Sequence, residues 1–340
     1  MRITAKWLIT TLGRLLILGA LVTFYLWLYY HTPTAREGQT QIINIPSGMS
    51  LTSIATTLEQ AHVIRQRWMF VLYVSLLQRG SYLQAGAYAL RATMSPAQIV
   101  HILHSGKVVR HTLTIPEGLT MRDTASLVAA KGLGNQQTLL DLASDHTLIA
   151  SLGLTVPSLE GYLFPETYHV SHGMPERDLL MLMVRTLQKN YTQEIATQAQ
   201  RLGLSQHEVL TLASLIEKEA QLDEERSLIA AVYHNRLRRG MRLQCDPTVI
   251  YALGERFDGN LRKADLDVDS PYNTYRYVGL PPGPIASPGR QSIAAAVAPA
   301  PVDYLYFVAT GHNGTHQFSR TLLEHNNAVA KYQLNTKPSP

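Results

Sequence analysis

The sequence predicts an α+β protein in which short strands alternate with amphipathic helices behind one apolar amino-terminal helix. Three observations support this prediction. Residues 15–30 are almost wholly apolar, a strand–turn–helix pattern occurs twice between residues 42 and 125, and the carboxy-terminal half combines helical periodicity with Pro- and Gly-rich loops. At 340 residues, with 46% hydrophobic and 16% charged residues, the chain is long enough for about two packed domains.

The composition excludes several classes of protein. The net charge of +5 is spread along the chain without a block of Lys and Arg, so we expect no nucleic-acid partner. Cys245 is the single cysteine, which rules out an intramolecular disulfide and a cysteine-based metal or redox cluster. The 13 histidines show no His-Glu-x-x-His spacing, and a metal site is therefore unsupported.

The apolar run near the amino terminus predicts a membrane anchor. Residues 15–35 contain no Asp, Glu, Lys or Arg. The run is slightly short for the hydrocarbon core, but residues 7–13 extend it if Arg14 snorkels to the interface. A cleaved signal peptide is the alternative, although the run lacks a small-x-small cleavage site and is long for such a peptide. We therefore expect a retained, single-pass anchor.

Positive charge before the run, at Arg2, Lys6 and Arg14, predicts a cytoplasmic amino terminus. The remainder then lies outside the inner (cytoplasmic) membrane, in the periplasm of a cell that has an outer membrane. The expected parts are a cytoplasmic tip with the anchor (1–31), a polar linker (32–41), a repeat region (42–156) and a carboxy-terminal domain (157–340).

The repeat region contains the same pattern seventy residues apart. Residues 42–45 predict a strand that ends at Pro46-Ser47-Gly48, and residues 113–115 predict a second strand that ends at Pro116-Glu117-Gly118. A short amphipathic helix follows each turn. Between the copies, residues 88–90 predict another strand, and Ser95-Pro96 predicts the start of a helix that ends at Gly106.

A helix with two carboxylates is the most informative stretch of the second half. Ser205 and Glu208 have the spacing of a capping box, which predicts that the helix begins there. Apolar residues recur on one helix face as far as Ala220, and Glu217 lies at the edge of that face, where partial desolvation suits a general acid. The alternative is that Glu217 and Glu219 begin a solvated acidic run that continues to Glu225.

Other parts of this half predict binding walls or core. Residues 159–168 combine two acids with three aromatic residues, which suits sugar binding and core packing equally. One helix is expected from about Asp178 to Arg201. Irregular, rigid loops are expected at residues 241–248, 270–275 and 279–285, a late strand at 303–308, and a hairpin-like segment at 312–318.

Several longer motifs together carry a resemblance to a known family. They are the anchor, the Pro-x-Gly repeat, Glu160-Gly161 with Phe164-Pro165, the stretch 213–219 (Ala-Ser-Leu-Ile-Glu-Lys-Glu), Asn235-Arg236-Leu237, Leu243-Gln244 with 246–251, Tyr272-Asn273-Thr274-Tyr275 and 279–285. The chain closely resembles the endolytic murein transglycosylase family, the YceG-like proteins, over nearly its whole length. Cys245 departs from the small hydroxyl residue expected there. The first repeat copy resembles a LysM-like module, a type associated with glycan recognition, although a spacer role is equally open.

This resemblance implies an α+β catalytic domain that cuts peptidoglycan glycan strands, with Glu217 at the position of the catalytic glutamate. Glu217 would protonate the bridging oxygen and then accept a proton from the C6 hydroxyl of N-acetylmuramic acid, which gives a 1,6-anhydro end without metal or cofactor. The resemblance also implies substrate-binding roles for Glu160, Gln244, Asp246, Tyr272 and Asn273. The expected partners are glycan strands, the inner membrane and peptidoglycan synthases (penicillin-binding proteins).

Two rival functions remain open from the sequence. The chain could be a true hydrolase in which Asp246 or Glu219 acts as the second carboxylate, since ordinary glycosidases need two. It could also be a membrane-tethered, non-enzymatic scaffold that binds glycan. Product analysis separates the first from a transglycosylase, and binding without cleavage identifies the second.

Overall fold

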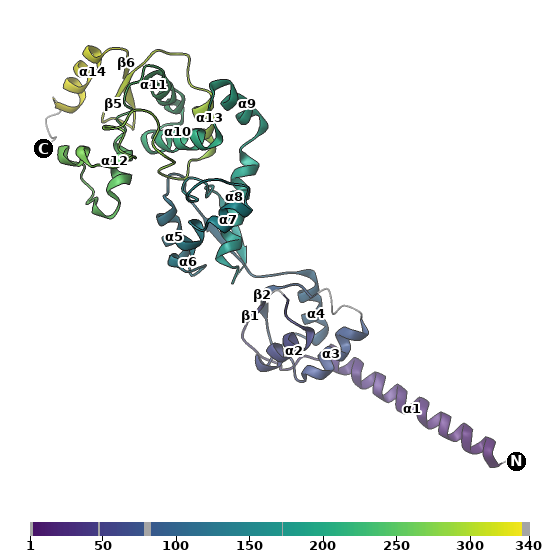
Figure 1. Ribbon diagram of the computed structural model, residues 1–340. Coiled ribbons are helices and arrows are strands. Elements are labelled where there is room, and N and C mark those ends of the chain that lie inside the picture. The colour runs from purple at the N-terminus through teal and green to yellow at the C-terminus, as the bar shows by residue number, and fades with distance from the viewer. Residues whose placement is uncertain (1–2, 47, 78–82, 172, 335–340) are drawn as a thin grey trace. The chain divides into compact units, whose positions relative to one another are not determined.

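The computed structural model describes residues 3–46, 48–77, 83–171 and 173–334, and Figure 1 shows its ribbon. Arg2 and Ser47, on which two expectations rest in part, lie outside the described residues. Helices dominate, and three two-stranded sheets occur among the described residues, which confirms the predicted α+β class. The chain divides into a smaller unit, residues 1–111 with 169–174, and a larger unit, residues 112–168 with 175–340.

Helix α1 (Ile3–His31) contains the predicted apolar run. Its segment Thr10–His31 is long and apolar enough to cross a membrane. Large side chains such as Leu16 are exposed along it, whereas Tyr29 and Tyr30 at its end are buried with Met69 of helix α3 (Arg67–Leu76). Most of α1 therefore has no protein partner in the part of the chain that the structure describes, and an anchor role remains a prediction.

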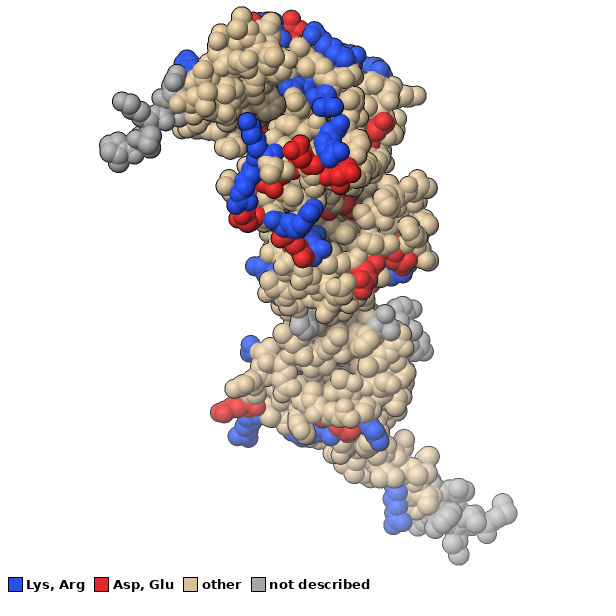
Figure 2. All heavy atoms as spheres, turned by 60° about the vertical axis from the view of Figure 1, so that its left-hand side comes forward, with Lys and Arg blue, Asp and Glu red and all other residues tan. Residues whose placement is uncertain are grey.

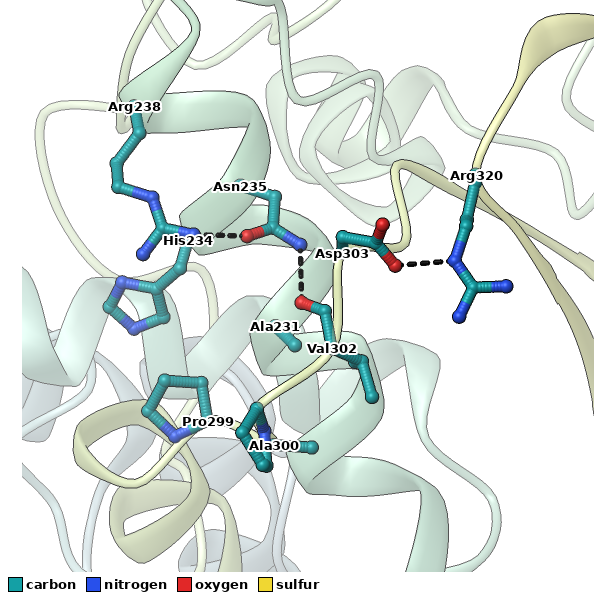
Figure 3. Close-up of a pocket in the computed structure, with 10 residues that line it drawn as sticks. Ala231, His234, Asn235, Arg238, Pro299, Ala300, Val302, Asp303 and Arg320 are labelled. Carbon is teal, nitrogen blue, oxygen red and sulfur yellow. Dashed lines mark hydrogen bonds and ion pairs between the residues drawn. The ribbon is translucent and has the colours of Figure 1, made fainter.

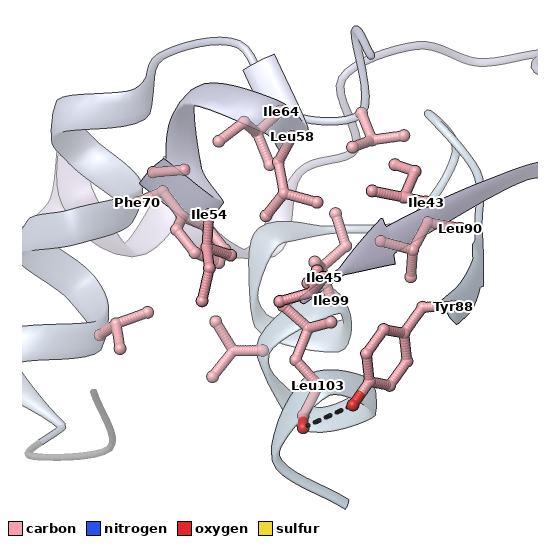
Figure 4. Close-up of a cluster of buried hydrophobic side chains, with 14 residues drawn as sticks. Ile43, Ile45, Ile54, Leu58, Ile64, Phe70, Tyr88, Leu90, Ile99 and Leu103 are labelled. Atoms are coloured by element: carbon pink, nitrogen blue, oxygen red, sulfur yellow. Dashed lines mark hydrogen bonds between the residues drawn. The ribbon is translucent and has the colours of Figure 1, made fainter. Parts of the chain in front are cut away.

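The smaller unit has its core between one sheet and three helices. Strands β1 (Gln41–Ile45) and β2 (Gly86–Leu90) pair antiparallel, with Ile43 opposite Tyr88. Helices α2 (Leu51–Gln60), α3 and α4 (Pro96–Ser105) pack around them. Figure 4 shows the resulting cluster of buried hydrophobic side chains, in which the Tyr88 hydroxyl donates to the Leu103 carbonyl at 3.4 Å. The predicted strand at 88–90 and the predicted helix after Ser95 are both confirmed.

The predicted strand–turn–helix repeat is also confirmed as local structure. The second copy consists of strand β3 (Arg110–Thr114) and helix α5 (Met121–Ala130). Ser50 and Thr120 cap the two helices in the same way, because each side-chain oxygen accepts the backbone amide three residues later. Helix α2 belongs to the smaller unit and α5 to the larger one, so the copies have different surroundings. Residues 112–156, grouped above with the repeat region, lie in the larger unit.

The larger unit is built around helix α10 (Gln206–Glu219). Its residues 209–216 are all buried, and α11, α12 and α13 pack against it. The Ser205–Glu208 capping box is present as predicted. The surrounding elements are α6 (Gln136–Ala143), α7 (His146–Ser151), α8 (Glu176–Asn190), α9 (Gln193–Leu202), α11 (Arg226–Arg238), α12 (Asp246–Leu253), α13 (Arg290–Val297), α14 (Leu322–Val329), and strands β5 (Tyr306–Ala309) and β6 (His316–Ser319). Strand β4 (Thr167–Ser171) has residues in both units. Strand β3 pairs with β4, and β5 pairs with β6.

Two expected elements differ from the structure. The single helix expected from Asp178 to Arg201 is wrong, because the chain breaks at Tyr191 and restarts when Thr192 caps α9 by accepting the amide of Ile195. The loop expected at 241–248 ends early, because α12 begins at Asp246 with a proline in its first turn. The second change bears on the site, since it places Asp246 at a helix start.

Candidate active site

A cavity of about 430 Å³ opens beside the carboxy-terminal end of α10. The residues around it come from the start of α12, from β5 and β6, and from α14 with the turn after it. They are Glu219, Arg236, Leu243, Gln244, Asp246, Tyr275, Phe307, Val308, Ala309, His316, His325, Val329 and Gln333. Three of the residues predicted or considered for catalysis and binding therefore meet here, namely Glu219, Gln244 and Asp246.

Glu219 is a carboxyl group held in a desolvated position at the cavity wall. Burial raises its pKa, and the nearby Asp246 carboxylate raises it further. The thiol of Cys245 and the hydroxyl of Tyr233, the latter 3.4 Å from Oε1, form hydrogen bonds to it and oppose that rise. A carboxyl group whose pKa is raised and which faces a cavity has the properties of a general acid.

Cys245, the expected departure from the family pattern, lies behind Glu219. Its side chain is fully buried, and burial raises the pKa of the thiol well above its usual range. The thiol is therefore neutral and acts as a hydrogen-bond donor to the Glu219 carboxyl. Its backbone amide donates to Thr274 Oγ1 at 3.0 Å, which fixes the residue between α10 and the 270–275 loop.

Gln244 has an unusual backbone conformation in the same loop. Its φ is +49°, in the left-handed region that non-glycine residues rarely adopt. The backbone amide donates to the Thr274 carbonyl at 3.1 Å, and the side-chain oxygen accepts from Arg236 Nη1 at 3.4 Å. Arg236 also donates to the carbonyls of Leu243 and Leu305, both at 2.7 Å. The buried guanidinium of Arg236 thus holds the loop that presents Gln244 to the cavity.

Asp246 and His316 complete the polar wall. Asp246 is exposed, and its Oδ1 accepts a hydrogen bond of 2.5 Å from the Tyr275 hydroxyl. His316 Nδ1 lies 2.7 Å from the Glu225 carboxylate, which also accepts the His316 backbone amide at 2.9 Å. His316 was not among the residues predicted for the site, because no spacing or motif around it distinguishes it from the other histidines.

Glu217 has different surroundings. Its Oε1 lies 3.1 Å from Arg226 Nη1, and its Oε2 accepts the backbone amide of Gly289 at 2.8 Å. The two side chains of this ion pair are only 6% (Glu217) and 10% (Arg226) exposed. Gly289 caps α13, so the carboxylate also lies at a helix amino terminus, where negative charge is favourable. Glu217 is not among the described residues that line the cavity, and it links α10 to α11 and α13.

Glu160 and Tyr272 form a third group beside helix α5. Glu160 is 7% exposed, and its carboxylate accepts the Met121 amide at 2.9 Å and the Tyr251 hydroxyl at 3.3 Å. Burial raises the pKa of Glu160 to about 7, and these two hydrogen bonds oppose the rise. The ring of Tyr272 lies 4.9 Å from that of Tyr251. The described residues that line the cavity include none of these, so any contact with substrate remains a prediction.

Asn273 uses its side chain within the fold. It is completely buried, and its amide group donates to the carbonyls of Leu266 and Val268 at 2.9 and 2.8 Å. Its side-chain oxygen accepts the backbone amide of Tyr275 at 2.9 Å. These contacts position the loop that carries Tyr275, and they support an indirect role for Asn273.

Figure 3 shows a second cavity, of about 440 Å³, at the far end of α11. Asn235 donates to the Val302 carbonyl at 3.0 Å and accepts from Arg238. The carboxyl group at this cavity, Asp303, is exposed and paired with Arg320 at 2.5 Å, which favours its charged form. A carboxyl group whose pKa is lowered by an ion pair is a poor proton donor, so the chemistry favours the Glu219 cavity as the active site.

Neither cavity has the donor set of a metal site. In the ranges that the structure describes, no group of three or more His, Cys, Asp or Glu side chains is arranged to hold a metal ion. The Glu219 cavity instead offers one protonatable carboxyl group, one exposed carboxylate, an amide and a tyrosine hydroxyl. Such groups suit proton transfer to and hydrogen bonding with a carbohydrate.

Comparison with known proteins agrees with this chemistry. A model of the YceG-like family matches residues 43–331. The chain belongs to the YceG-like family. A crystal structure of a YceG-like protein from Listeria monocytogenes is 38% identical, with a TM-score of 0.59, and the match covers 86% of this chain and 99% of that one.

Two curated relatives carry a functional name. The endolytic murein transglycosylase of Bacillus subtilis (strain 168) is 38% identical over 317 residues, which cover 88% of this chain and 87% of that protein. The protein of the same name from Streptococcus pneumoniae serotype 2 (strain D39) is 33% identical over 326 residues. That match covers 87% of this chain but 58% of the longer pneumococcal protein, so the YceG-like region is the shared part.

Proposed function

We propose that this protein is a membrane-anchored lytic transglycosylase that cleaves peptidoglycan glycan strands internally, with Glu219 as the residue that transfers the proton. Two relatives are named endolytic murein transglycosylase, and the YceG-like family covers residues 43–331. The observation that carries the assignment to Glu219 is its position, because the partly buried carboxyl group has a raised pKa and lines a cavity of about 430 Å³.

The proposed reaction needs one carboxyl group. Protonated Glu219 donates its proton to the oxygen that bridges C1 of N-acetylmuramic acid and C4 of N-acetylglucosamine, and the C1–O bond breaks. The C6 hydroxyl oxygen of the same muramic acid then bonds to C1, while the Glu219 carboxylate accepts the hydroxyl proton. The products are a 1,6-anhydromuramic end and a new C4 hydroxyl. No water is consumed, and the proton returns to Glu219.

Other residues of the cavity provide hydrogen bonds and a negative charge for the substrate. The exposed side chains of Gln244 and Asp246 provide hydrogen-bonding groups beside Glu219, and the Tyr275 hydroxyl fixes the orientation of Asp246. A negative charge at Asp246 favours the positive charge that develops on the sugar ring as the C1–O bond breaks. It also raises the pKa of Glu219 and so helps that residue to keep its proton.

The sequence-based assignment of catalysis to Glu217 stays a prediction. Its buried ion pair with Arg226 and its hydrogen bond from Gly289 support a structural role instead. The alternative of a two-carboxylate hydrolase also has one observation in its favour, since Glu219 and Asp246 line the same cavity. A hydrolase would yield reducing muramic acid ends that contain solvent oxygen, whereas a transglycosylase yields anhydro ends without it.

The proposal also includes roles for helix α1 and for the smaller unit. Helix α1, if it spans the inner membrane with its amino terminus in the cytoplasm, holds the catalytic unit near newly made strands. Glycan recognition by the smaller unit, as a LysM-like module, and an association with peptidoglycan synthases remain predictions. The test of the whole proposal is incubation of the full-length protein with isolated sacculi, followed by mass analysis for anhydromuramic ends.

A further inference from the structure

A second hollow of about 540 Å³ adjoins the Glu219 cavity. Its lining consists of Arg242, Gln244, Lys263, Leu266, Asp267, Tyr275 and Arg276. Gln244 and Tyr275 line both spaces, so the two cavities share a wall. A molecule bound at Glu219 can therefore extend into the second hollow without leaving the surface of the larger unit.

The second hollow differs in charge from the first. Three cationic side chains and one carboxylate line it, whereas the carboxyl groups of Glu219 and Asp246 line only the first cavity. Figure 2 shows Lys and Arg side chains close to Asp and Glu side chains on one face of the larger unit. Most cations on this face therefore have carboxylates nearby.

Arg242 and Lys263 are exceptions among these cations. Both are exposed, and within the part of the chain that the structure describes neither side chain has a hydrogen bond or an ion pair. Arg276, in contrast, donates to the Asp267 carbonyl at 2.8 Å and lies 3.8 Å from the Asp269 carboxylate. Arg242 and Lys263 thus line the hollow with their charges available to a ligand.

The proposed substrate carries carboxylate groups, which suit the cations of the second hollow. The sugar rings of murein are neutral, and its carboxylates are on the lactyl group of muramic acid or on the stem peptide that extends from it. The muramic acid whose C1 faces Glu219 carries this substituent on C3 of the same ring, two carbons from the reacting C1. A carboxylate on it would meet unpaired cations in the adjoining hollow.

We propose that the hollow lined by Arg242 and Lys263 is a subsite for a carboxylate carried by the muramic acid at the cleavage point, and that it makes the enzyme select anionic strands. This inference rests on the proposed function at Glu219. Each exposed ion pair contributes up to about 1 kcal/mol, so two of them change the Michaelis constant about tenfold. Salt screens exposed charges, and the preference weakens as ionic strength rises.

The experiment compares three substrates with full-length protein in detergent. They are uncross-linked strands with stem peptides, the same strands with every carboxyl group converted to an amide, and strands stripped of peptide by an amidase, which carry the lactyl carboxylate. For wild type we expect kcat/KM about tenfold higher on strands that carry the recognised carboxylate than on amidated strands. If the stem peptide supplies that carboxylate, peptide-bearing strands are preferred and stripped strands behave like amidated ones. The lactyl carboxyl is free only on stripped strands, so if it is the recognised group, stripped strands are preferred and peptide-bearing strands behave like amidated ones.

The variant that tests the subsite is the double substitution Arg242→Gln with Lys263→Gln. In this variant, the ratio of kcat/KM on carboxylate-bearing strands to kcat/KM on amidated strands should fall to about one. The control Arg201→Gln, which removes an exposed charge from α9, should keep the wild-type ratio. A wild type that cleaves all three strands with the same kcat/KM, or a double variant that keeps the preference, would overturn the subsite. If no strand is cleaved, the proposed function has failed, and binding of the three strands measured by fluorescence anisotropy still tests the subsite by the same ratios.

Discussion

Glu217 and Glu219 lie two residues apart on α10, and their carboxyl groups lie in different surroundings. Two residues correspond to about 200° around a helix, so side chains at this spacing point to opposite sides. Glu217 forms a buried ion pair with Arg226, and Glu219 faces the cavity that contains Gln244 and Asp246. One helix end therefore contributes both an internal ion pair and the candidate acid.

Glu217→Gln is expected to destabilise the protein and to leave the chemistry largely intact. Removal of one charge from a buried ion pair leaves Arg226 with one carboxylate, that of Asp223, among the described residues, so we expect a loss of about 3 kcal/mol in the free energy of unfolding. Chemical denaturation measures this loss. The exposed Glu224→Gln substitution is the control and should have almost no effect. A stable Glu217→Gln protein without activity would support the catalytic role that the sequence suggested.

Cys245→Ala is expected to shift the pH dependence of cleavage. The thiol donates a hydrogen bond that lowers the pKa of Glu219, and its removal should raise that pKa. Activity requires protonated Glu219, so kcat/KM falls as pH rises through this pKa, and the alkaline limb should move to higher pH in the variant. Cys245→Ser keeps a donor and should leave the limb near its original place. An unchanged profile for Cys245→Ala would contradict this role of the thiol.

Glu160→Gln is expected to change how stability depends on pH. Burial raises the pKa of Glu160 from 4.5 to about 7, so the folded protein favours the protonated form. The stabilisation that comes from protonated Glu160 is complete below pH 4.5 and is lost as pH rises to about 7. This changes the free energy of unfolding by about 3 kcal/mol. Relative to wild type, Glu160→Gln should therefore become more stable as pH rises through this range.

Denaturation curves at pH 5 and pH 8 provide the measurement for Glu160. The difference between variant and wild type cancels the titration of all other groups. The exposed Glu166→Gln substitution, six residues away, serves as the control and should show no such trend. A difference between Glu160→Gln and wild type that is the same at both pH values would show that Glu160 is not held with a raised pKa.

The parts of the fold that could be predicted are those decided by a residue and its near neighbours. Ser50, Thr120 and Ser205 each cap a helix, and the oxygen and the amide involved are three residues apart in sequence. The break at Tyr191 could not be predicted in this way, because apolar periodicity continues across it. The local signal there, Thr192 as a cap, competes with a pattern that fits one longer helix equally well.

The segments that form the candidate site could be predicted, but not which of their residues line the cavity. Residues 209–216 of α10 are buried on every side, so the apolar periodicity does not reveal which face of the helix borders the cavity. The choice between Glu217 and Glu219 depends on partners distant in sequence, Gly289 for one and Asp246 for the other. His316 enters the same cavity through the pairing of β5 with β6, a contact that no local pattern records.

The most direct test of the central claim is product analysis with Glu219→Gln and Glu217→Gln in the full-length protein, on isolated sacculi in water enriched in heavy oxygen. Wild type should release strands with 1,6-anhydromuramic ends that contain no solvent oxygen. Glu219→Gln should be folded, as judged by circular dichroism, and should release none, because an amide cannot donate the proton. Near-normal release of anhydro ends by Glu219→Gln would contradict the assignment, and wild-type ends that carry solvent oxygen would contradict the reaction.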